Sequence, residues 1–453
     1  MVTVQQASKN VVAGTPVTFN STVSGTGALS YQWLRNNAAI AGATSASYSH
    51  PAVLPSDSAV AIRVQVKSNE GTTLSRPVAL EISGPGVFPF AGANNHASPI
   101  SPLAGSLPPS GTEGSADGFG QQARFKSIAN LAIDNAGVMY ATDSLNYTVR
   151  RITPDALVST LAGSPGTSDA ADGQGAAAGF RHPVNIAVTG GGTVYVQDEP
   201  LNTDVPYPIR SISPAGVVAT LRIPVDALNT NANGTQAQEY IESFAVDALD
   251  NLYIVTSATL NGRCEPRIAI ASCPTFAGYR RYSVRKLAPG GAITTVLTSE
   301  SAYGFMKATL PDFDFYPNEI TVNAGGKLFL ALDSMILTMA PGGALTALAG
   351  VPSFSGYPDG TGSAARFSHL INIAVDKADN VYVSDVTSGL TACRIRQITP
   401  AGVVKTVYGD VNKRETTLGS LQGSLATCTG LAIDSKNTVY TSTRTGIVKI
   451  VLQ

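Results

Sequence analysis

Hydrophobic and polar residues alternate in the same way in six short segments of the chain. Aligned on their final aromatic residue, they read NLAIDNAGVMY, NIAVTGGGTVY, SFAVDALDNLY, EITVNAGGKLF, NIAVDKADNVY and GLAIDSKNTVY, and they end at Tyr140, Tyr195, Tyr253, Phe329, Tyr382 and Tyr440. Each segment joins an alternating apolar stretch to a second apolar stretch through a turn rich in Asp, Gly or Asn. This pattern predicts two strands connected as a hairpin.

A third apolar stretch follows every copy, as in VRRITP and IRQITP, and a fourth follows five of them, as in LVSTLAG and VVKTVYG. Four antiparallel strands per unit, repeated six times, are typical of propeller blades. Almost no segment shows helical periodicity. The sequence therefore predicts an all-β fold with a six-bladed β-propeller.

The sixth copy lacks its fourth strand, because the chain ends at Gln453 soon after the third. The segment VFPFAG at residues 87–92 resembles the STLAG ending of the first fourth strand. A ring of blades leaves no open sheet edge when its last blade is completed by the other end of the chain. We therefore predict that residues 87–92 close the sixth blade, so that the propeller spans residues 87–453.

The segments ADGQGAAAGFRHPVNIAV and YPDGTGSAARFSHLINIAVD, followed by YVSD and CRIRQITPAGVVKTV, resemble NHL-repeat propellers over residues 87–453. The resemblance implies the fold but no single function, because this family includes lyases, hydrolases, adhesins and scaffolds. The family usually has Gly just before IAVD, and only Gly430 conforms here. The other copies carry Asn130, Asn185, Ser243, Glu319 and Asn372.

Residues 1–83 have a different pattern, and residues 84–86 are expected to link them to the propeller. The segments GTPVTFNSTVSG and YQWLRNNAAIAGATSASYS resemble a bacterial immunoglobulin-like module. Trp33 fits the buried position on the third strand of such a β-sandwich. The two cysteines typical of that fold are absent, with Ser21 and Val64 near their places, so we expect the module to depend on its apolar core.

Composition limits which partners and which surroundings we expect for the protein. The 453 residues are 43% hydrophobic and only 13% charged, against about 25% charged in typical soluble domains, and the net charge is −1. No apolar run is long enough to span a membrane. Without a basic patch we expect no nucleic-acid partner.

Four cysteines are compatible with two disulfides or with four buried thiols. Cys264 and Cys273 lie close together in the sequence and suggest a local disulfide. Cys393 and Cys428 are the other two candidates. An even cysteine count with few charges favours a periplasmic, cell-surface or secreted protein. No signal peptide is visible, and we expect one to have been removed.

The residue before each IAVD-like strand should lie at one level of the propeller, around the top mouth of its channel. These positions hold Glu319, Asn130, Asn185, Asn372 and Ser243. One carboxylate with three amides supplies the oxygen ligands that Ca²⁺ prefers. The arrangement is similar to that of calcium-dependent propeller hydrolases such as gluconolactonase. The alternative is that these groups cap strand starts and bind channel water.

Other candidates surround the same face. His182 and His369 each stand three residues before a channel asparagine. Phe313, Phe315 and Tyr316 lie in a long connection, where they would stack on a sugar or another small ligand, or simply fill space between blades. The recurring Asp134, Asp247, Asp376 and Asp434 are expected to cap turns.

Two functions follow as predictions. The first is an extracytoplasmic, monomeric scaffold whose top face binds a protein, a small molecule or a glycan. This prediction rests on the lack of a readable set of nucleophile, base and orienting group. The alternative is a calcium-dependent hydrolase of a lactone or ester, with the ion held by Glu319, Asn130, Asn185 and Asn372.

Overall fold

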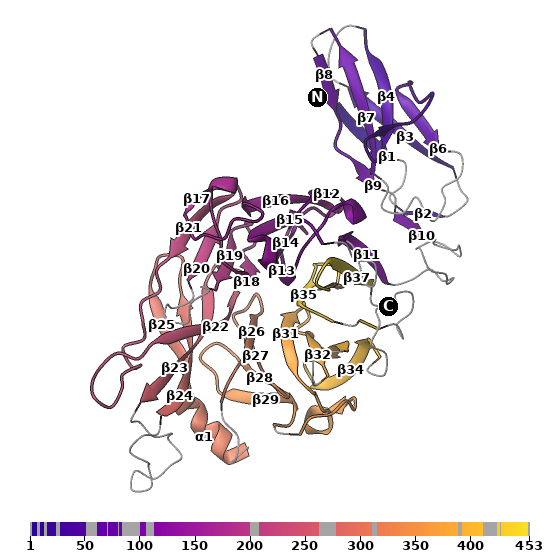
Figure 1. Cartoon of the computed structure of the whole chain (residues 1–453). Coiled ribbons are helices and arrows are strands. Elements are labelled where there is room, and N and C mark those ends of the chain that lie inside the picture. Colours follow the sequence, from indigo (N-terminus) through magenta and orange to yellow (C-terminus); the bar gives the residue numbers. More distant parts are fainter. Residues whose placement is uncertain are drawn as a thin grey trace.

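The computed structural model describes residues 2–6, 10–12, 16–23, 28–50, 61–69, 71–79, 81–83, 100–105, 113–199, 208–261, 278–309, 315–352, 354–387, 392–410, 424–425 and 427–451. Most of this chain forms six antiparallel sheets arranged around a ring (Figure 1). The innermost strands contact one another in a closed cycle, in the order β13, β18, β22, β26, β31, β35 and back to β13. This arrangement confirms the predicted β-propeller.

Three blades have a fifth, short outer strand. Blade one contains β12 (Gly118–Phe119), β13 (Ile128–Ile133), β14 (Met139–Asp143), β15 (Thr148–Ile152) and β16 (Leu157–Gly163). Blade two contains β17 (Gly173–Gln174), β18 (Pro183–Val188), β19 (Val194–Asp198), β20 (Ile209–Ile212) and β21 (Val217–Leu221). Blade five contains β30 (Gly360–Thr361), β31 (Leu370–Val375), β32 (Val381–Val386), β33 (Cys393–Ile398) and β34 (Val403–Tyr408).

The other three blades have four strands each. Blade three contains β22 (Glu239–Val246), β23 (Leu252–Asn261), β24 (Gly278–Leu287) and β25 (Ile293–Thr298). Blade four contains β26 (Glu319–Val322), β27 (Leu328–Leu332), β28 (Met335–Met339) and β29 (Leu345–Gly350). Blade six contains β35 (Gly430–Ile433), β36 (Thr438–Ser442), β37 (Gly446–Val451) and β11 (Ile100–Gly105).

The strand that closes the ring is β11, which pairs antiparallel with β37 from Ile100 opposite Ile450 to Gly105 opposite Gly446. The prediction that residues 87–92 form this strand was therefore wrong, and those residues lie outside the described part of the chain. The segments PFAG and PLAG end alike, so local sequence could not separate them. Ala104 is fully buried between blades six and one, which ties the chain's two ends together.

In the described part of the chain, four 3-10 turns and one helix interrupt the strands: η2 (Gly120–Gln122), η3 (Ser144–Asn146), η4 (Gly175–Ala177), η6 (Gly362–Ala364) and α1 (Ser299–Thr309). The sequence pattern gave no sign of α1. Among its described side chains, Ala302 and Phe305 pack in the core between blades three and four. A helix of 11 residues has too short an apolar stripe to produce a recognisable helical period.

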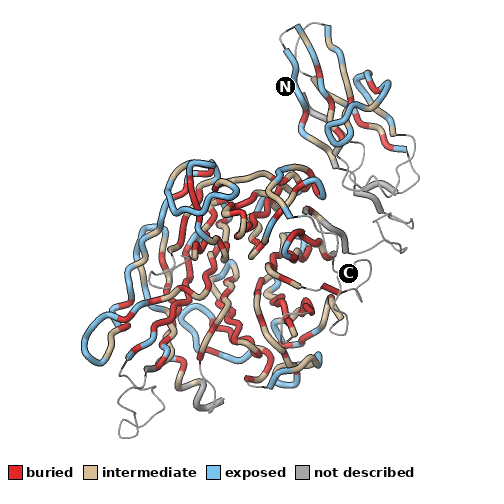
Figure 2. Tube along the Cα trace, viewed as in Figure 1, coloured by how far each residue is buried: buried red, intermediate tan, exposed pale blue. Residues whose placement is uncertain are grey.

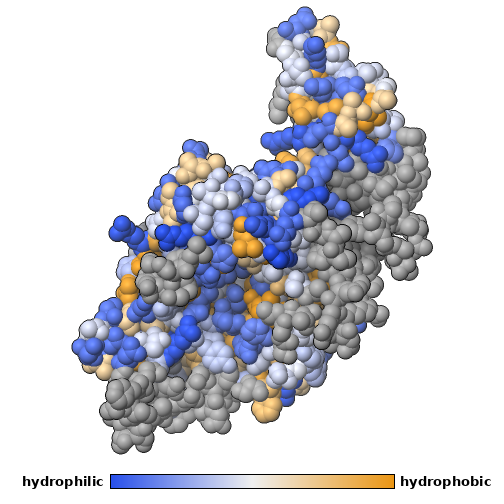
Figure 3. Space-filling model, in the orientation of Figure 1, coloured by the Kyte–Doolittle hydropathy of each residue, from blue (hydrophilic) through white to orange (hydrophobic). Residues whose placement is uncertain are grey.

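Apolar side chains fill the spaces between neighbouring blades. Buried residues concentrate along the strands, while the connections are mostly exposed (Figure 2). Exposed large hydrophobic residues such as Leu249 and Phe354 come from separate connections. On the face turned to the viewer, hydrophobic residues form small groups among hydrophilic ones (Figure 3).

Four of the six first hairpin turns are capped by an aspartate, as predicted, and Thr189 and Asn323 take its place in blades two and four. In blade one, Asp134 Oδ1 accepts hydrogen bonds from the amides of Ala136 and Val138, and Oδ2 accepts one from the hydroxyl of Tyr140. Asp247, Asp376 and Asp434 accept the equivalent bonds in blades three, five and six. The repeated tyrosine near the start of the second strand therefore fixes the turn as well as the core.

A buried arginine locks three of the blades. Arg150 is fully buried and bonds Asp143 at 3.1 Å and Asp117, of the DGFG loop, at 2.7 Å. Asp143 also accepts hydrogen bonds from the amides of Lys126 and Ser127. Blades two and five repeat the group with Arg210, Asp198 and Asp172 and with Arg396, Asp385 and Asp359. The aspartates of these three loops therefore tie the loops to the buried arginines.

The N-terminal part forms two small groups of strands. The first group, β1 (Val2–Gln6), β3 (Val17–Val23) and β6 (Ser47–His50), faces the second, β4 (Ser30–Arg35), β5 (Ala38–Ala39), β7 (Ala61–Ser68), β8 (Gly71–Leu74) and β9 (Val78–Ala79). Strands β2 (Asn10–Val12) and β10 (Glu81–Ser83) pair separately. Trp33 is fully buried between Phe19 and Tyr48, and its indole N–H donates to the carbonyl of Ser45.

Candidate functional site

Five polar residues of the innermost strands surround one cavity on the propeller axis. We call the face at which the innermost strands begin the top face. A cavity of about 180 Å³ runs between these strands and is lined near their starts by Asn130, Asn185, Ser243, Glu319 and Asn372. Residues of the same strands and of β35 line the rest, and all of them except Thr321 are apolar. A cavity of this size holds several water molecules, which the polar groups at its mouth would bind.

Glycine at the sixth position of the ring has a steric cause. A Cβ atom on Gly430 would lie 2.8 Å from both the Cα atom of Asn130 and the amide nitrogen of Leu131. Backbone atoms cannot withdraw as a flexible side chain can, so no larger residue fits there. The ring therefore has five polar members and a gap where blade six meets blade one.

The amides of the ring are tied to neighbouring blades. Asn185 Nδ2 donates to Gln197 Oε1 at 2.9 Å and to the backbone oxygen of Glu242 at 3.1 Å. Asn130 Nδ2 donates to Asn185 Oδ1 at 3.4 Å, and Asn372 Nδ2 donates to the carbonyl oxygen of Thr429 at 3.4 Å. These bonds orient the amides and use part of their hydrogen-bonding capacity.

Glu319 is the one carboxyl group of the ring. The hydroxyl of Ser243 donates a hydrogen bond to Glu319 Oε2 at 2.8 Å. Burial raises the pKa of Glu319 to about 8, because protein atoms replace the water that would stabilise its charge, and the bond from Ser243 only partly opposes this rise. At neutral pH the group is mainly protonated, so it offers both a donor and an acceptor to the cavity.

This donor set fits Ca²⁺ poorly at neutral pH. The ion binds best to ionised carboxylates, and the single carboxyl of the ring is held protonated by its surroundings. Asn185 Oδ1 is already engaged by Asn130. Among the described residues, no group of three or more His, Cys, Asp or Glu side chains is placed to hold a metal.

A β-bulge stands beside the polar ring in four of the innermost strands. The pairing register shifts between Ile128 and Leu131, Pro183 and Ile186, Ile241 and Ser243, and Leu370 and Asn372. Without a bulge, residues three apart on a strand point to opposite faces. In β22 the extra residue places Tyr240 on the same face as Ser243. Ser127, His182 and His369 directly precede the strands that carry Asn130, Asn185 and Asn372.

His182 and His369, which stand three residues before Asn185 and Asn372, are each paired with an acid. His182 Nδ1 lies 3.2 Å from Glu199 Oε2, and the side chains are 33% and 38% exposed. His369 Nδ1 contacts Asp333 Oδ1, with 46% and 42% of the side chains exposed. Blades two and five are opposite in the ring, so the pairs flank the mouth from two sides.

Blade three contributes a third pair. Glu242, the bulged residue of β22, accepts hydrogen bonds from the hydroxyl of Ser257 and from the guanidinium of Arg280. The Arg280 guanidinium also lies over the ring of Tyr282, 5.5 Å from its centroid. Ser257 lies on β23, and Arg280 and Tyr282 lie on β24.

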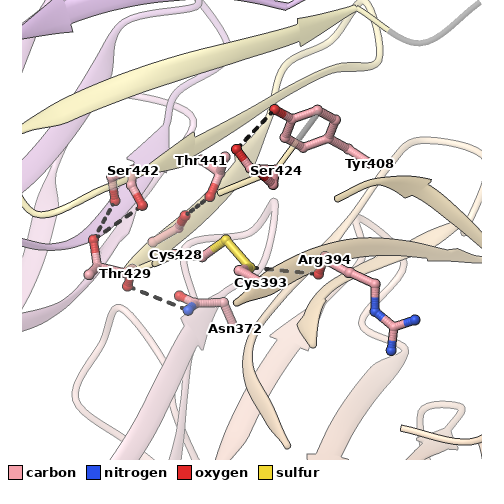
Figure 4. Close-up of a disulfide and its surroundings, with 10 residues drawn as sticks. Asn372, Cys393, Arg394, Tyr408, Ser424, Cys428, Thr429, Thr441 and Ser442 are labelled. Atoms are coloured by element: carbon pink, nitrogen blue, oxygen red, sulfur yellow. Dashed lines mark hydrogen bonds between the residues drawn. A yellow bond between two sulfur atoms is a disulfide. The ribbon is translucent and has the colours of Figure 1, made fainter. Parts of the chain in front are cut away.

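A disulfide braces the mouth beside Asn372. Cys393 at the start of β33 is bonded to Cys428, and their Cα atoms are 5.9 Å apart (Figure 4). Thr429, the next residue, donates its amide to the carbonyl of Ser442 at 2.9 Å and accepts the bond from Asn372. The disulfide thus joins blades five and six. The predicted staple of Cys264 and Cys273 lies outside the described residues.

The aromatic candidates separate in the structure. Phe315 is buried in the core between blades three and four, with Val255 and Leu330, so it cannot contact a ligand without leaving that core. Tyr316 is half-buried just before β26. Phe313 lies outside the described residues.

Sequence analysis missed three residues at the mouth: Tyr240, Glu242 and Gln197. Tyr240 had a readable signal, because it stands three residues before Ser243, as each histidine does before its asparagine. Glu242 had none, because a bulge depends on pairing with another strand. Gln197 is recognisable only once the register of β19 against Asn185 is known.

Three solved structures resemble nearly the whole chain. A protein of unknown function from Bacteroides thetaiotaomicron has 15% identity over 100% of this chain and 98% of its own, with a TM-score of 0.53. Auxiliary nutrient-binding proteins from the same species and from Bacteroides ovatus have 14% and 15% identity over 99% of this chain and 97% of theirs, with TM-scores of 0.51 and 0.50. At these identities the likeness establishes the fold alone.

No family model and no curated protein matches the sequence. Within the described residues, no helix is long and apolar enough to cross a membrane.

Proposed function

We propose that this protein is an extracytoplasmic binding protein that holds its ligand at the top mouth of the propeller channel. The observation that carries the proposal is the convergence of Asn130, Asn185, Ser243, Glu319 and Asn372 on one cavity. Polar groups gathered in a closed space are costly unless they are hydrogen-bonded, and a ligand that enters can take over bonds from channel water.

Two further facts support an extracytoplasmic location and a binding role. The disulfide between Cys393 and Cys428 is of the kind that persists in oxidising compartments. Two proteins that share the fold over their whole length are described as auxiliary nutrient-binding proteins. We also propose that the propeller is of the NHL-repeat type, and that the N-terminal strands around Trp33 form an immunoglobulin-like module, as their sequence patterns suggest.

A thermal-shift screen tests the binding proposal. Wild type, Asn130→Leu and Leu249→Ala are each titrated with small molecules and peptides. Leu249 is 73% exposed in the turn between β22 and β23, on the opposite face. We expect a ligand to raise the melting temperature of wild type and of Leu249→Ala but not of Asn130→Leu. Ligands that stabilise all three proteins equally would place binding elsewhere and refute the proposal.

The calcium-dependent hydrolase of a lactone or ester is the competing proposal, and it depends on Glu319. Calcium binding there requires loss of the proton that burial retains, with a pKa of about 8. Calcium affinity would therefore rise steeply from pH 6 to pH 9 in wild type and be absent in Glu319→Gln. Calorimetry showing no calcium binding at pH 9 would eliminate this alternative.

A further inference from the structure

Two asparagines of the polar ring are oriented by backbone atoms. Asn185 Nδ2 donates to the backbone oxygen of Glu242 at 3.1 Å, and Asn185 Oδ1 accepts from Asn130 Nδ2. Asn130 Oδ1 accepts from the backbone amide of Leu131 at 2.8 Å. A backbone amide only donates and a backbone carbonyl only accepts, so neither side-chain amide can be turned over without losing a bond. The nitrogen and oxygen atoms of both side chains are therefore fixed in place.

The third asparagine and the carboxyl group of the ring are also oriented by their neighbours. Asn372, which is 4% exposed, donates from Nδ2 to the backbone oxygen of Thr429 (Figure 4). Glu319 Oε2 accepts a hydrogen bond from the hydroxyl of Ser243 at 2.8 Å. Burial raises the pKa of Glu319 to about 8, so the group keeps its proton at neutral pH. Oε1 is the oxygen that is free to carry this proton.

Among the hydrogen bonds of the described residues, the ring keeps more unused donors than unused amide oxygens. A side-chain amide nitrogen has two hydrogen atoms to donate, and a protonated carboxyl group has one. Asn185 donates both of its hydrogen atoms, whereas Asn130 and Asn372 donate one each. With the proton of Glu319, three donors are left over. Against them stands one amide oxygen that receives no bond, Oδ1 of Asn372.

This surplus of donors indicates what the ring can bind. Buried donors without an acceptor are rarer in proteins than oxygens with a spare lone pair, so an occupant of the ring should bring acceptors. A carboxylate brings two oxygens, and its bonds are about twice as strong as those between neutral groups. The cavity of about 180 Å³ is comparable to cavities of about 150 Å³ that hold benzene, so a small organic acid fits.

An incoming carboxylate would meet no fixed anion at the level of the ring. Glu319 is the only titratable residue among the described residues that line the cavity. The strands packed against β26 are β22, β23, β27 and β31. The titratable side chains on these strands and at the upper ends of β27 and β31 are Glu239, Tyr240, Glu242, Tyr253, Asp333 and His369. Burial rather than neighbouring negative charge raises the pKa of Glu319, so these acids do not dominate the electrostatics of the ring.

We propose that the polar ring binds the carboxylate group of a small organic acid, with Asn130, Asn372 and Glu319 donating hydrogen bonds to its oxygens. Glu319 donates only while it is protonated, and once ionised it places a second negative charge beside the ligand. Affinity should therefore fall as pH rises through the pKa of about 8. The calcium-dependent alternative requires the opposite dependence on pH. This inference rests on the proposed binding function and specifies the ligand class for the same site.

Calorimetry on the full chain tests the inference with acetate, lactate and benzoate. Acetamide and methylammonium serve as neutral and cationic comparison probes. We expect at least one of the three carboxylates to bind wild type saturably at pH 7. Its affinity should fall at least about tenfold between pH 7 and pH 9.5, because most of the Glu319 side chains lose their proton over this interval.

Three variants assign this binding to the ring. Glu319→Gln keeps a donor but cannot ionise, so it should bind the same carboxylate with little change between pH 7 and pH 9.5. Asn372→Leu removes one donor to a charged group, which should weaken binding about tenfold or more. Leu249→Ala, on the far face, should leave the affinity and its pH dependence unchanged.

The outcomes separate the two proposals. The carboxylate inference is refuted if no carboxylate binds, if a folded Asn372→Leu binds as tightly as Leu249→Ala, or if wild type and Glu319→Gln share one pH profile. If acetamide or methylammonium then binds and Asn130→Leu abolishes that binding, the mouth is still the binding site and only the ligand class is wrong. If no probe responds to Asn130→Leu, both proposals fail. Should a low melting temperature show that Asn372→Leu is misfolded, the pH profile of Glu319→Gln decides.

Discussion

At the scale of single residues, the ring at the channel mouth shows how one position acquires different chemistry in each blade. Asn130, Asn185 and Asn372 are held by bonds to adjacent blades. Glu319 accepts a hydrogen bond from Ser243 of blade three and has a pKa raised by burial, while Gly430 is fixed by the backbone next to it. Equivalent sequence positions therefore differ because each faces a different neighbour.

Replacing Glu319 with Gln should change how stability depends on pH. The folded pKa of about 8 lies above the ordinary value of 4.5, so the folded state holds this proton more tightly than the unfolded chain does. The stabilisation from the protonated group is complete below about pH 4.5 and is lost as pH rises towards 8, with a slope of at most about 1.4 kcal/mol per unit.

Urea unfolding across this pH range measures the effect. In Glu319→Gln the free energy of unfolding should fall less between pH 5 and pH 8 than in wild type. Glu113→Gln, which removes an exposed carboxylate, should behave like wild type. Parallel pH profiles for wild type and Glu319→Gln would show that Glu319 is ordinarily ionised in the folded protein.

Gly430→Ala should destabilise the junction of blades six and one, because the new Cβ would press on backbone atoms of Asn130 and Leu131 at 2.8 Å. Overpacking of this kind costs about 1–3 kcal/mol. Gly290→Ala is the matched control, since its Cβ would meet nothing within 4 Å. Chemical denaturation of both variants is the measurement, and equal unfolding free energies would contradict the close packing at Gly430.

At the scale of elements, the blades repeat one strand plan, but their interiors are charged in some blades and apolar in others. Blades one, two and five bury an arginine between aspartates. Blade four has Leu332 and Leu337 at the corresponding positions, and both are fully buried. The same backbone thus accepts either a satisfied ion pair or apolar packing.

Breaking the pair in blade one should be costly, and replacing both partners much less so. Arg150→Leu leaves Asp143 buried without its cation, which costs about 3–5 kcal/mol. The double variant Arg150→Leu with Asp143→Leu reproduces the leucines of blade four, so it should lose less free energy of unfolding than the sum of the two single variants. The double variant will recover only part of the lost free energy of unfolding, because the amides of Lys126 and Ser127 lose their acceptor. Strictly additive losses in this double-mutant cycle would refute the coupling.

At the scale of the whole molecule, the ring is held by contacts between distant parts of the chain. Strand β11 joins β37 across most of the sequence, and the disulfide joins blade five to the segment that enters blade six. The N-terminal strands also touch blade one, where the guanidinium of Arg63 lies 5.1 Å from the ring centroid of Phe119.

Two truncations test the closure. A chain that begins at residue 100 keeps β11, whereas one that begins at residue 106 exposes the edge of β37. Both lack the N-terminal strands, so the contact of Arg63 is removed equally. We expect the shorter chain to unfold at a lower temperature and less cooperatively in calorimetry. Identical transitions would mean that β11 does not contribute to the ring.

The sequence by itself determined the features that depend on neighbouring residues. Strand alternation, the aspartate-capped turns and the six-fold repeat are local, so they predicted the blades and put Asn130, Asn185, Ser243, Glu319 and Asn372 at one level. Tertiary structure decided what depends on contact between distant segments. It selected residues 100–105 rather than 87–92 as the closing strand, because only pairing with β37 separates two similar endings. It also raised the pKa of Glu319 and formed the bulges, since burial and register arise only when strands meet.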